Sequence, residues 1–423
     1  MKAISFLGFN PHKGYDKTIY ISPDGSDECE TEFFQEAMVK FYKPKVLYVL
    51  LTNTAEKGIP KDRTESNWDA LQKRLSGKVE LHPIKNVPES SSPEELWKIF
   101  ALLTEYLQDN DEVLFDITYG FRFLPIVALI AVSYLRVVRK VKINGLIYGA
   151  RDAQNEETNQ TPIFDLLPIV SLLEWTTATD QFLKTGNGQA LAELLHNGDP
   201  ATEELANNID NIAQGLQLLR PMDVMQEAAL LPEKITAASS SISESLPPFT
   251  TLLRRVENDY GNFGLKNPTE YTISPQAALI RQLRMVEWYA EKGQIVQALS
   301  MAREWLPSLL CHHFNIDPQV KRTNRPEMEL LLSGGTTPPD KQGNKYTSPF
   351  LKQYKETVSR DKRTQLSNLW SDTHRLAKLR NDVLHAGFRK NPQSAEYIIE
   401  QTKQIVEELR KIAQAWDLKD EAE

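Results

Sequence analysis

Cysteine is almost absent from this chain of 423 residues. Cys29 and Cys311 are the only two, they lie far apart in the sequence, and neither has a CxxC partner. This scarcity excludes a disulfide scaffold and a cysteine-based zinc site, and it fits a reducing environment. We therefore expect a cytoplasmic protein that is not held together by disulfides or by cysteine-bound zinc.

Long hydrophobic runs are missing as well. The longest apolar run, residues 123–132, is much shorter than the roughly 20 residues that a membrane-spanning helix needs. The amino-terminal run MKAISFLGFNPHKG is interrupted by Gly8 and Pro11 and lacks a signal-peptide cleavage pattern. The sequence thus predicts a protein without a membrane partner.

Positive charge is not in excess, because Lys and Arg total 49 against 57 Asp and Glu, which gives a net charge of −8. That balance argues against a basic, tail-driven nucleic-acid binder but leaves a local basic site open. At about 100–200 residues per domain, the length suggests two or three domains.

Short apolar runs alternate with amphipathic helical patterns over the first third of the chain. The runs are rich in Val, Ile, Leu and Phe, which is typical of parallel strands buried on both faces. We expect strands at residues 3–7, 46–51, 79–83, 113–115 and 141–148, with helices at 32–41, 68–75, 94–107 and 124–135. This alternation predicts an α/β domain over residues 1–168 with a doubly wound, Rossmann-like parallel sheet.

Two further runs extend that sheet in our interpretation. Residues 18–22 are expected to form a hairpin arm, and residues 163–167 to pair antiparallel with 145–148. After about residue 167 the pattern is helical, with 3.6-residue spacing at 172–183, 190–195, 209–219, 277–290, 296–310, 366–384 and 395–416. A Ser-rich stretch at 237–248 and a Gly- and Pro-containing loop at 333–348 are expected to interrupt the helices. The second domain, residues 169–423, is therefore all-α.

Ligands of open parallel sheets bind at the carboxyl ends of the strands, near the topological switch point. The residues expected there are small, hydroxylated, aromatic or basic. Small and hydroxylated residues let backbone N–H groups approach phosphates, and aromatic rings can stack on bases. These candidate ligand-binding residues are Gly8, Phe9, Asn10, Thr52, Asn53, Asp116, Thr118, Tyr119, Gly120, Arg122, Tyr148 and Gly149. Taken one by one, such residues also occur as ordinary turns and helix caps. The GxGxxG fingerprint is absent, which disfavours a nicotinamide or flavin enzyme.

Residues 366–388 hold the most informative helical segment. Arg380 falls on its apolar stripe, where a charge needs a partner or a function. Asn381 and His385 are four residues apart and share a helical face, and Gly387 is a plausible helix C-cap. The stretch 351–390 contains ten Lys and Arg against four Asp and Glu, a local charge of +6 that suits an RNA backbone.

An imidazole beside a guanidinium suits phosphodiester chemistry. Histidine exchanges protons near neutral pH, and Arg stabilises charge on phosphoryl oxygens. With an RNA 2′-hydroxyl as nucleophile, no metal is required. The alternative is structural: Arg380 snorkels to the surface and His385 is a cation at the helix C-terminus.

Two motifs resemble a known family. DITYG at 116–120 resembles the DxTHG motif, with Tyr119 at the usual His position, and RNDVLH at 380–385 resembles the RNxxxH signature of HEPN ribonucleases. In this order they resemble the accessory ribonucleases of type III CRISPR systems, which join a CRISPR-associated Rossmann-fold (CARF) sensor to a HEPN nuclease. TEFFQEA (31–37), WTTATDQFLKTG (175–186) and ALSMAREWL (298–306) also read like that family, so the resemblance covers most of the chain.

The resemblance implies a homodimer, or a higher oligomer, with a helical domain that ends in a HEPN bundle. Cyclic oligoadenylate, tetra-adenylate rather than hexa-adenylate, would bind the CARF pocket as allosteric activator, with no other cofactor. Arg380, Asn381 and His385 of two subunits would then cleave single-stranded RNA without metal, leaving a 2′,3′-cyclic phosphate, in antiviral defence and without a stable complex with the CRISPR effector. Two alternatives stay open: a non-catalytic, ligand-sensing regulator, and a ring nuclease that degrades the cyclic activator in the CARF pocket.

Overall fold

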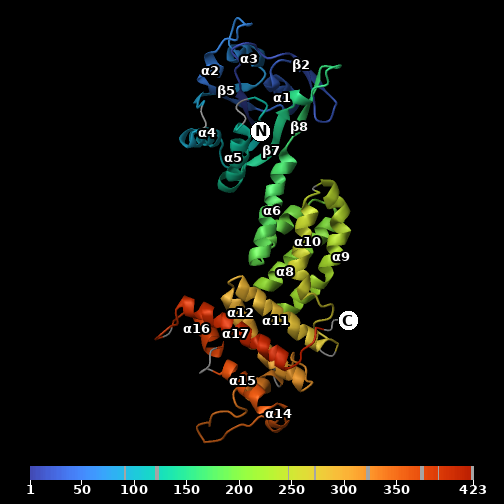
Figure 1. Ribbon diagram of the computed structural model, residues 1–423, viewed down its shortest axis with the longest axis vertical. Coiled ribbons are helices and arrows are strands. Elements are labelled where there is room, and N and C mark those ends of the chain that lie inside the picture. The colour runs from blue at the N-terminus through green and yellow to red at the C-terminus, as the bar shows by residue number, and fades with distance from the viewer. Residues whose placement is uncertain are drawn as a thin grey trace. The chain divides into compact units, whose positions relative to one another are not determined.

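The computed structural model describes residues 1–89, 92–119, 123–245, 247–270, 273–320, 324–371, 376–388 and 390–420. The chain folds into two compact units, Met1–Glu174 and Trp175–Glu423. We call these the N-terminal and the C-terminal unit. Figure 1 shows strands in the first and helices throughout the second. Within the described ranges, no helix combines the length and the apolarity that a bilayer crossing requires.

The N-terminal unit is built on a mostly parallel, Rossmann-like sheet. Among the described residues its strand order is β3-β2-β8-β7-β6-β1-β4-β5. The strands are β1 (Lys2–Leu7), β2 (Thr18–Ile21), β3 (Glu28–Thr31), β4 (Val46–Thr52), β5 (Glu80–Val87), β6 (Glu112–Asp116), β7 (Lys142–Gly149) and β8 (Gln160–Asp165). The pairs β1–β4, β1–β6, β4–β5, β6–β7 and β2–β8 are parallel, whereas β2–β3 and β7–β8 are antiparallel. The predicted hairpin arm and the antiparallel pairing of residues 145–148 are therefore confirmed.

Helices cover both faces of this sheet, so the strands are buried on two sides, as their continuous apolar sequences predict. One core packs strand side chains such as Leu47 and Val49 against α1 (Phe34–Tyr42) and α3 (Asn67–Leu75). The other packs Phe6 and Phe115 against α4 (Pro93–Glu105) and α5 (Leu124–Arg139). Ser66 and Ser92 cap α3 and α4 through their side chains, which fixes where these helices begin. The short helix α2 (Asn53–Lys57) and a 3₁₀ turn, Arg151–Ala153, complete the unit.

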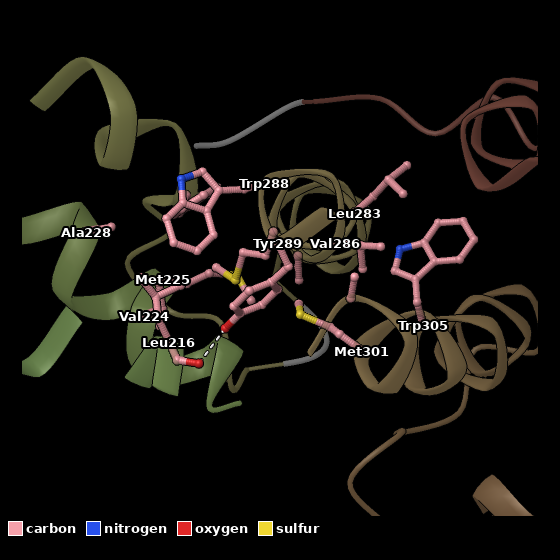
Figure 2. Packing of buried hydrophobic residues seen from close by; sticks show 14 of the residues in the cluster. Leu216, Val224, Met225, Ala228, Leu283, Val286, Trp288, Tyr289, Met301 and Trp305 are labelled. Atoms are coloured by element: carbon pink, nitrogen blue, oxygen red, sulfur yellow. Dashed lines mark hydrogen bonds between the residues drawn. The ribbon is translucent and has the colours of Figure 1, made fainter. Parts of the chain in front are cut away.

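The C-terminal unit is all-helical among its described residues. Helix α6 (Leu167–Thr185) enters it, followed by α7 (Gln189–Leu195), α8 (Pro200–Gln217), α9 (Pro221–Ser245), α10 (Phe249–Tyr260), a 3₁₀ turn (Gly261–Phe263), α11 (Pro275–Glu291), α12 (Ile295–His313), α13 (Asn324–Leu332), α14 (Leu351–Thr357), α15 (Arg360–Trp370), α16 (Leu376–Leu384) and α17 (Ala395–Ala415). One apolar core runs through them. Figure 2 shows part of it, where Tyr289 lies among apolar side chains from several helices and its hydroxyl donates a 2.7 Å hydrogen bond to Leu216 O. The fold class predicted from the sequence is confirmed.

Two helix predictions are wrong in detail. The Ser-rich stretch at 237–248 does not interrupt the helices up to Ser245, because α9 continues through it with Ala238 and Ile242 buried and Ser239 donating to Ile235 O. Residues 366–384 are not one helix: α15 ends at Trp370, where Ser371 is extended, and α16 begins at Leu376. The apolar spacing continued across this break because Leu366, Leu369, Trp370, Leu376 and Leu379 all enter the same core.

Candidate functional site

The carboxyl ends of four parallel strands meet at one edge of the sheet. β4 ends at Thr52, β6 at Asp116 and β7 at Gly149, with Gly8 directly after β1. After β2 and β3, which lie at the far edge, the chain places β4 and β5 on one side of β1 and then β6 on the other side. The topological switch point thus lies between β1 and β6, where ligands of this class of fold bind. We call the candidate residues at this edge the strand-end cluster; Gly120 and Arg122 lie outside the described residues.

The loop after β1 is held mainly by a residue that the sequence patterns did not reveal. The hydroxyl of Tyr15 donates a 2.8 Å hydrogen bond to Gly8 O, and Gly8 N donates to the same hydroxyl at 2.9 Å. The ring of Phe9 packs so closely on Gly58 that a Cβ at Gly58 would lie 2.6 Å from it. Asn10 is exposed, and its side chain accepts from His12 N. No local pattern marks Tyr15, which lies five residues beyond the predicted loop residues.

The end of β4 continues directly into α2. Thr52 caps this helix by accepting a hydrogen bond from Ala55 N, and Asn53 is exposed at its first position. Thr54 donates to Glu89 twice, from its N–H at 2.9 Å and from its hydroxyl at 2.6 Å. These two bonds stabilise the ionised carboxylate and hold the pKa of Glu89 below its usual value. A carboxylate of the chain itself therefore occupies these N–H and O–H donors.

Asp116 points into the protein rather than toward the edge. It is fully buried, accepts from Ser5 Oγ at 2.5 Å and from Thr118 N at 2.8 Å, and burial raises its pKa to about 6. Thr118 Oγ1 in turn accepts from Gly149 N at 2.9 Å. The Asp-x-Thr segment thus ties the ends of β6 and β7 to each other and to Ser5 of β1.

Tyr119 is also engaged inside the unit. Its ring stacks on Tyr15 with a centroid distance of 4.3 Å and an angle of 23°, and its hydroxyl donates to Glu32 O at 3.0 Å. A second hydroxyl, that of Tyr20, lies 3.3 Å from it, and burial raises the pKa of Tyr119. One face of the ring is covered by Tyr15, so stacking on a base, which suits the aromatic residues at this edge, is restricted to the other face.

The remaining two candidates at this edge are placed differently from each other. Gly149 is buried, and a Cβ there would lie 2.6 Å from the ring of Phe34, so its lack of a side chain serves packing. Tyr148 is half-buried, and its hydroxyl donates to Asp152 Oδ1 at 2.5 Å. The structure thus brings the predicted segments together at one edge. The side chains of Asp116 and Tyr119 make hydrogen bonds inside the unit, and Gly149 allows close packing, so these three stabilise the fold of the site.

The second candidate site lies at the end of α16. Leu376 and Leu379 anchor this helix in the core of the C-terminal unit. Arg380 follows, half-buried, and its Nη1 donates to Asn381 Oδ1 at 3.2 Å. Its Nε is buried, and no described residue accepts a hydrogen bond from it. His385 is exposed. We call Arg380, Asn381 and His385 the helix-end cluster.

His385 is the last residue held by the helix. Its N–H donates to Asn381 O at 3.0 Å, and the chain then reverses: Ala386 N donates to Val383 O and Gly387 N to Asp382 O. This pair of bonds is a Schellman motif, with the left-handed residue at Ala386, where φ is +52°. The predicted cap at Gly387, where φ is +72°, is therefore one residue too late. The motif fixes the backbone that presents His385 to solvent.

Among the described residues, no group of three or more His, Cys, Asp and Glu side chains is arranged to hold a metal ion. The helix-end cluster consists of one cationic, one amide and one imidazole side chain, a set that suits an anionic ligand. Acid–base chemistry and electrostatic stabilisation are what this arrangement offers.

Two family models match parts of the chain. The CARF domain of the CRISPR system endoribonuclease Csx1 matches residues 2–152, and the second domain of CRISPR-associated protein MJ1674 matches residues 171–267. CRISPR-associated protein MJ1674 of Methanocaldococcus jannaschii is 32% identical over 124 residues, which are 29% of this chain and 19% of that protein. The chain thus matches about a fifth of the length of this relative.

A solved structure shares the architecture over nearly the whole chain. Enterococcus italicus Csm6 bound to cyclic hexa-2′-fluoro-hexa-dAMP aligns with a TM-score of 0.50 and 11% sequence identity, covering 98% of this chain and 94% of that one. At this identity the likeness shows the fold: a Rossmann-like sheet domain followed by a helical region. Over residues 2–152 the N-terminal unit has a Rossmann-like sheet and is similar to the CARF domain of the CRISPR-associated endoribonuclease Csx1.

Proposed function

We propose that this protein is a metal-independent, single-stranded RNA endoribonuclease, activated by cyclic oligoadenylate, in type III CRISPR antiviral defence. The helix-end cluster carries the proposal. Arg380 is half-buried, and no described residue accepts a hydrogen bond from its Nε. Asn381 accepts from Arg380 Nη1, and His385 is exposed. A buried guanidinium N–H without an acceptor costs about 1–3 kcal/mol, so such a group favours an acceptor from outside the chain. The match of residues 2–152 to the CARF domain of an endoribonuclease supports the same reaction class.

The chemistry follows from the groups in the cluster. The RNA 2′-oxygen attacks the adjacent phosphorus and forms the O2′–P bond, while the P–O5′ bond breaks. His385 takes the proton from the 2′-hydroxyl or gives one to the leaving 5′-oxygen, and Arg380 stabilises the charge on the phosphoryl oxygens. Asn381 orients the phosphate or the His385 ring. The products are a 2′,3′-cyclic phosphate and a 5′-hydroxyl.

Activation is assigned to the strand-end cluster. It lies at the switch point of the sheet, where the side chains of Asn10 and Asn53 are exposed. The adjacent residue Thr54 of α2 already holds one anionic group, Glu89, through its N–H and its hydroxyl. The structural neighbour Csm6 was solved with a cyclic hexa-adenylate analogue, which supports a ring of adenylates as the ligand class. Cyclic tetra-adenylate and cyclic hexa-adenylate are therefore both included in the test.

The proposed unit is a homodimer, which suits a ring of repeated nucleotides because both have rotational symmetry. Helix α5 supports it with one exposed apolar stripe, Ile126, Ile130, Tyr134 and Val137, the last of which is 82% exposed. The stripe continues to α4, since Tyr134 contacts Phe100 and Phe100 contacts Trp97, which is 70% exposed. A contiguous apolar face of this kind marks an interaction surface.

The test uses the full chain with labelled single-stranded RNA and EDTA. Cleavage is measured without activator, with cyclic tetra-adenylate and with cyclic hexa-adenylate. We expect one of the rings to switch on cleavage that EDTA does not inhibit, with a 2′,3′-cyclic phosphate at the new 3′ end. No cleavage with either ring would contradict the proposal, and cleavage that EDTA abolishes would contradict metal independence.

A further inference from the structure

Phe388 is the most exposed of the large hydrophobic side chains that the structure describes. It is 90% exposed and lies three residues after His385. A fully exposed Phe gives up the free energy that its burial would contribute. Because Phe388 lies next to a candidate RNA-cleaving group, its exposure indicates a role in binding the substrate.

The backbone that leads into Phe388 is hydrogen-bonded, although the side chain of Phe388 is exposed. Phe388 N donates to His385 O at 2.9 Å, directly after the Schellman motif at the end of α16. On the far side of the loop, Gln393 N donates to the buried carboxylate of Asp382 at 2.9 Å. Pro392 closes on Gly387, where a Cβ would lie 3.6 Å from it. Phe388 N and Gln393 N are therefore both hydrogen-bonded to the end of α16, which reduces the entropy that Phe388 would lose on contacting a ligand.

Exposed cations on α16 and directly after it in the chain favour a nucleic acid as the ligand. Lys378 on α16 and Lys390, two residues after Phe388, are both exposed, and Arg380 belongs to the helix-end cluster. Aromatic rings among cations are how proteins bind single-stranded RNA, with a base stacked on the ring and the phosphates near the cations. A Phe ring has no hydrogen-bonding group, so stacking on it selects no particular base.

We propose that Phe388 is a substrate-positioning residue, on whose ring a base next to the scissile phosphate stacks. This inference rests on the proposed function, because it takes single-stranded RNA as the substrate of the helix-end cluster. Phe388 holds the nucleotide, and His385 and Arg380 act on the phosphate. A competing occupant is a second copy of this chain, because Leu384, four residues earlier, is also partly exposed. The experiment separates these two.

The first measurement compares steady-state cleavage of activated protein carrying Phe388→Ala or Phe388→Trp. Loss of a stacking partner weakens binding by about tenfold, so we expect KM to rise about tenfold for Phe388→Ala with kcat changed less than about threefold. Phe388→Trp should restore KM. Tyr346→Ala, which removes another exposed aromatic side chain of the C-terminal unit, is the matched control and should leave KM unchanged. The mass of each variant in solution is measured alongside.

The second measurement does not need cleavage. In a His385→Ala background, single-stranded RNAs with one 2-aminopurine at successive positions are titrated with protein. Stacking on Phe388 should quench 2-aminopurine fluorescence at one position, and Phe388→Ala should abolish the quenching whereas Phe388→Trp retains it.

The outcomes distinguish the two proposals. Absence of cleavage with any activator contradicts the proposed function, and the fluorescence titration still reports on Phe388. Cleavage with unchanged KM and unchanged quenching in Phe388→Ala overturns the stacking role. A Phe388→Ala protein whose mass falls to that of the monomer also overturns it, because Phe388 would then lie at an interface between copies.

Discussion

The strand-end cluster of the N-terminal unit gathers its groups from strands that end as far apart in the chain as Leu7 and Gly149, whereas the helix-end cluster takes its three side chains from residues 380–385. Two inward-facing side chains of the first are satisfied inside the unit: Asp116 by Ser5 and Thr118, and Tyr119 by Glu32 O. In the second, Arg380 Nε has no acceptor among the described residues and His385 is exposed.

This difference indicates what each site requires from outside. A self-satisfied cluster is preorganised, so a ligand there must replace existing contacts such as the one between Glu89 and Thr54. A cluster with an unpaired guanidinium N–H is incomplete until an acceptor arrives. The first arrangement suits the proposed sensor, which stays folded without its ligand. The second suits the proposed nuclease, which is complete only with its substrate and a partner copy.

The largest expected effect comes from the helix-end cluster. His385→Ala should lower activator-dependent RNA cleavage by about 10²–10⁴-fold, the usual contribution of a general acid–base group. Arg380→Ala should lower it by about 10²–10³-fold, because charge on the phosphoryl oxygens loses its partner. Rates are measured at saturating RNA. Binding of the cyclic activator, measured by calorimetry, should be unchanged in both variants.

Lys403→Ala is the matched control for these two, because it removes an exposed cation from α17, another helix of the C-terminal unit. It should change the rate at saturating RNA by less than about threefold. Cleavage that survives both His385→Ala and Arg380→Ala would show that the helix-end cluster is not the catalytic site.

The next effect concerns the apolar stripe of α5. Ile130→Glu places a charge in the proposed dimer face, and losing a buried Ile costs about 1.5–3 kcal/mol in each copy. The dimer should therefore dissociate at least about 100-fold more readily, and activated cleavage should fall with it. Sedimentation velocity over a range of concentrations measures the dissociation constant. Ile59→Glu, at another exposed position of the same unit, is the control; equal dimerisation of the two variants would contradict the assignment of this face.

The hydrogen bonds of Asp116 inside the strand-end cluster can be tested by varying the pH. Because burial raises its folded-state pKa from 3.8 to about 6, the folded state binds a proton more tightly than the unfolded state does. Its contribution to stability is therefore full below about pH 4 and is lost as the pH rises through about 6, a change of about 3 kcal/mol. Asp116→Asn should keep the bonds to Thr118 and Ser5 and remove this loss.

Hydrogen exchange of the β1 and β6 amides, corrected for the intrinsic exchange rate, measures the effect between pH 4 and 7. The difference in protection between Asp116→Asn and the parent chain should grow in favour of the variant as the pH rises. A difference that stays constant with pH would mean that Asp116 is ionised in the folded state over this whole range.

Sequence patterns predicted the sheet well because parallel strands buried on both faces are continuous apolar runs. They missed β3, since the sequence ECET carries three polar residues in an exposed edge strand, and α2, whose five residues are too few for a period. They joined α15 to α16 because residues of both helices are buried in one core, which preserves the apolar spacing across the break.

The two candidate sites differ in the same way. Residues 380–385 share a helix end, so their neighbourhood is local and spacing alone placed them on α16. The partners of the strand-end cluster are Ser5, Tyr15 and Glu32, which come from other elements, and no spacing in the chain connects them with Asp116 or Tyr119. The inward orientation of these two side chains could be found only from the packing of the sheet.

The smallest expected effect lies in the turn that presents His385. Ala386 adopts φ +52°, a left-handed conformation that costs a residue with a Cβ about 1–2 kcal/mol. Ala386→Gly removes this cost but raises the entropy of the unfolded chain, so the net effect should stabilise the end of α16 by about 0.5–1 kcal/mol. Gly387→Ala at φ +72° should destabilise it by a similar amount, since the new Cβ meets only ordinary contact with Pro392 and the cost is backbone strain. Exchange protection of the amides in residues 383–388 measures both changes. Because neither variant touches Arg380 or the imidazole, cleavage should stay within about threefold of the parent rate, and a larger loss in Ala386→Gly would show that a rigid turn is itself required to hold His385 for the reaction.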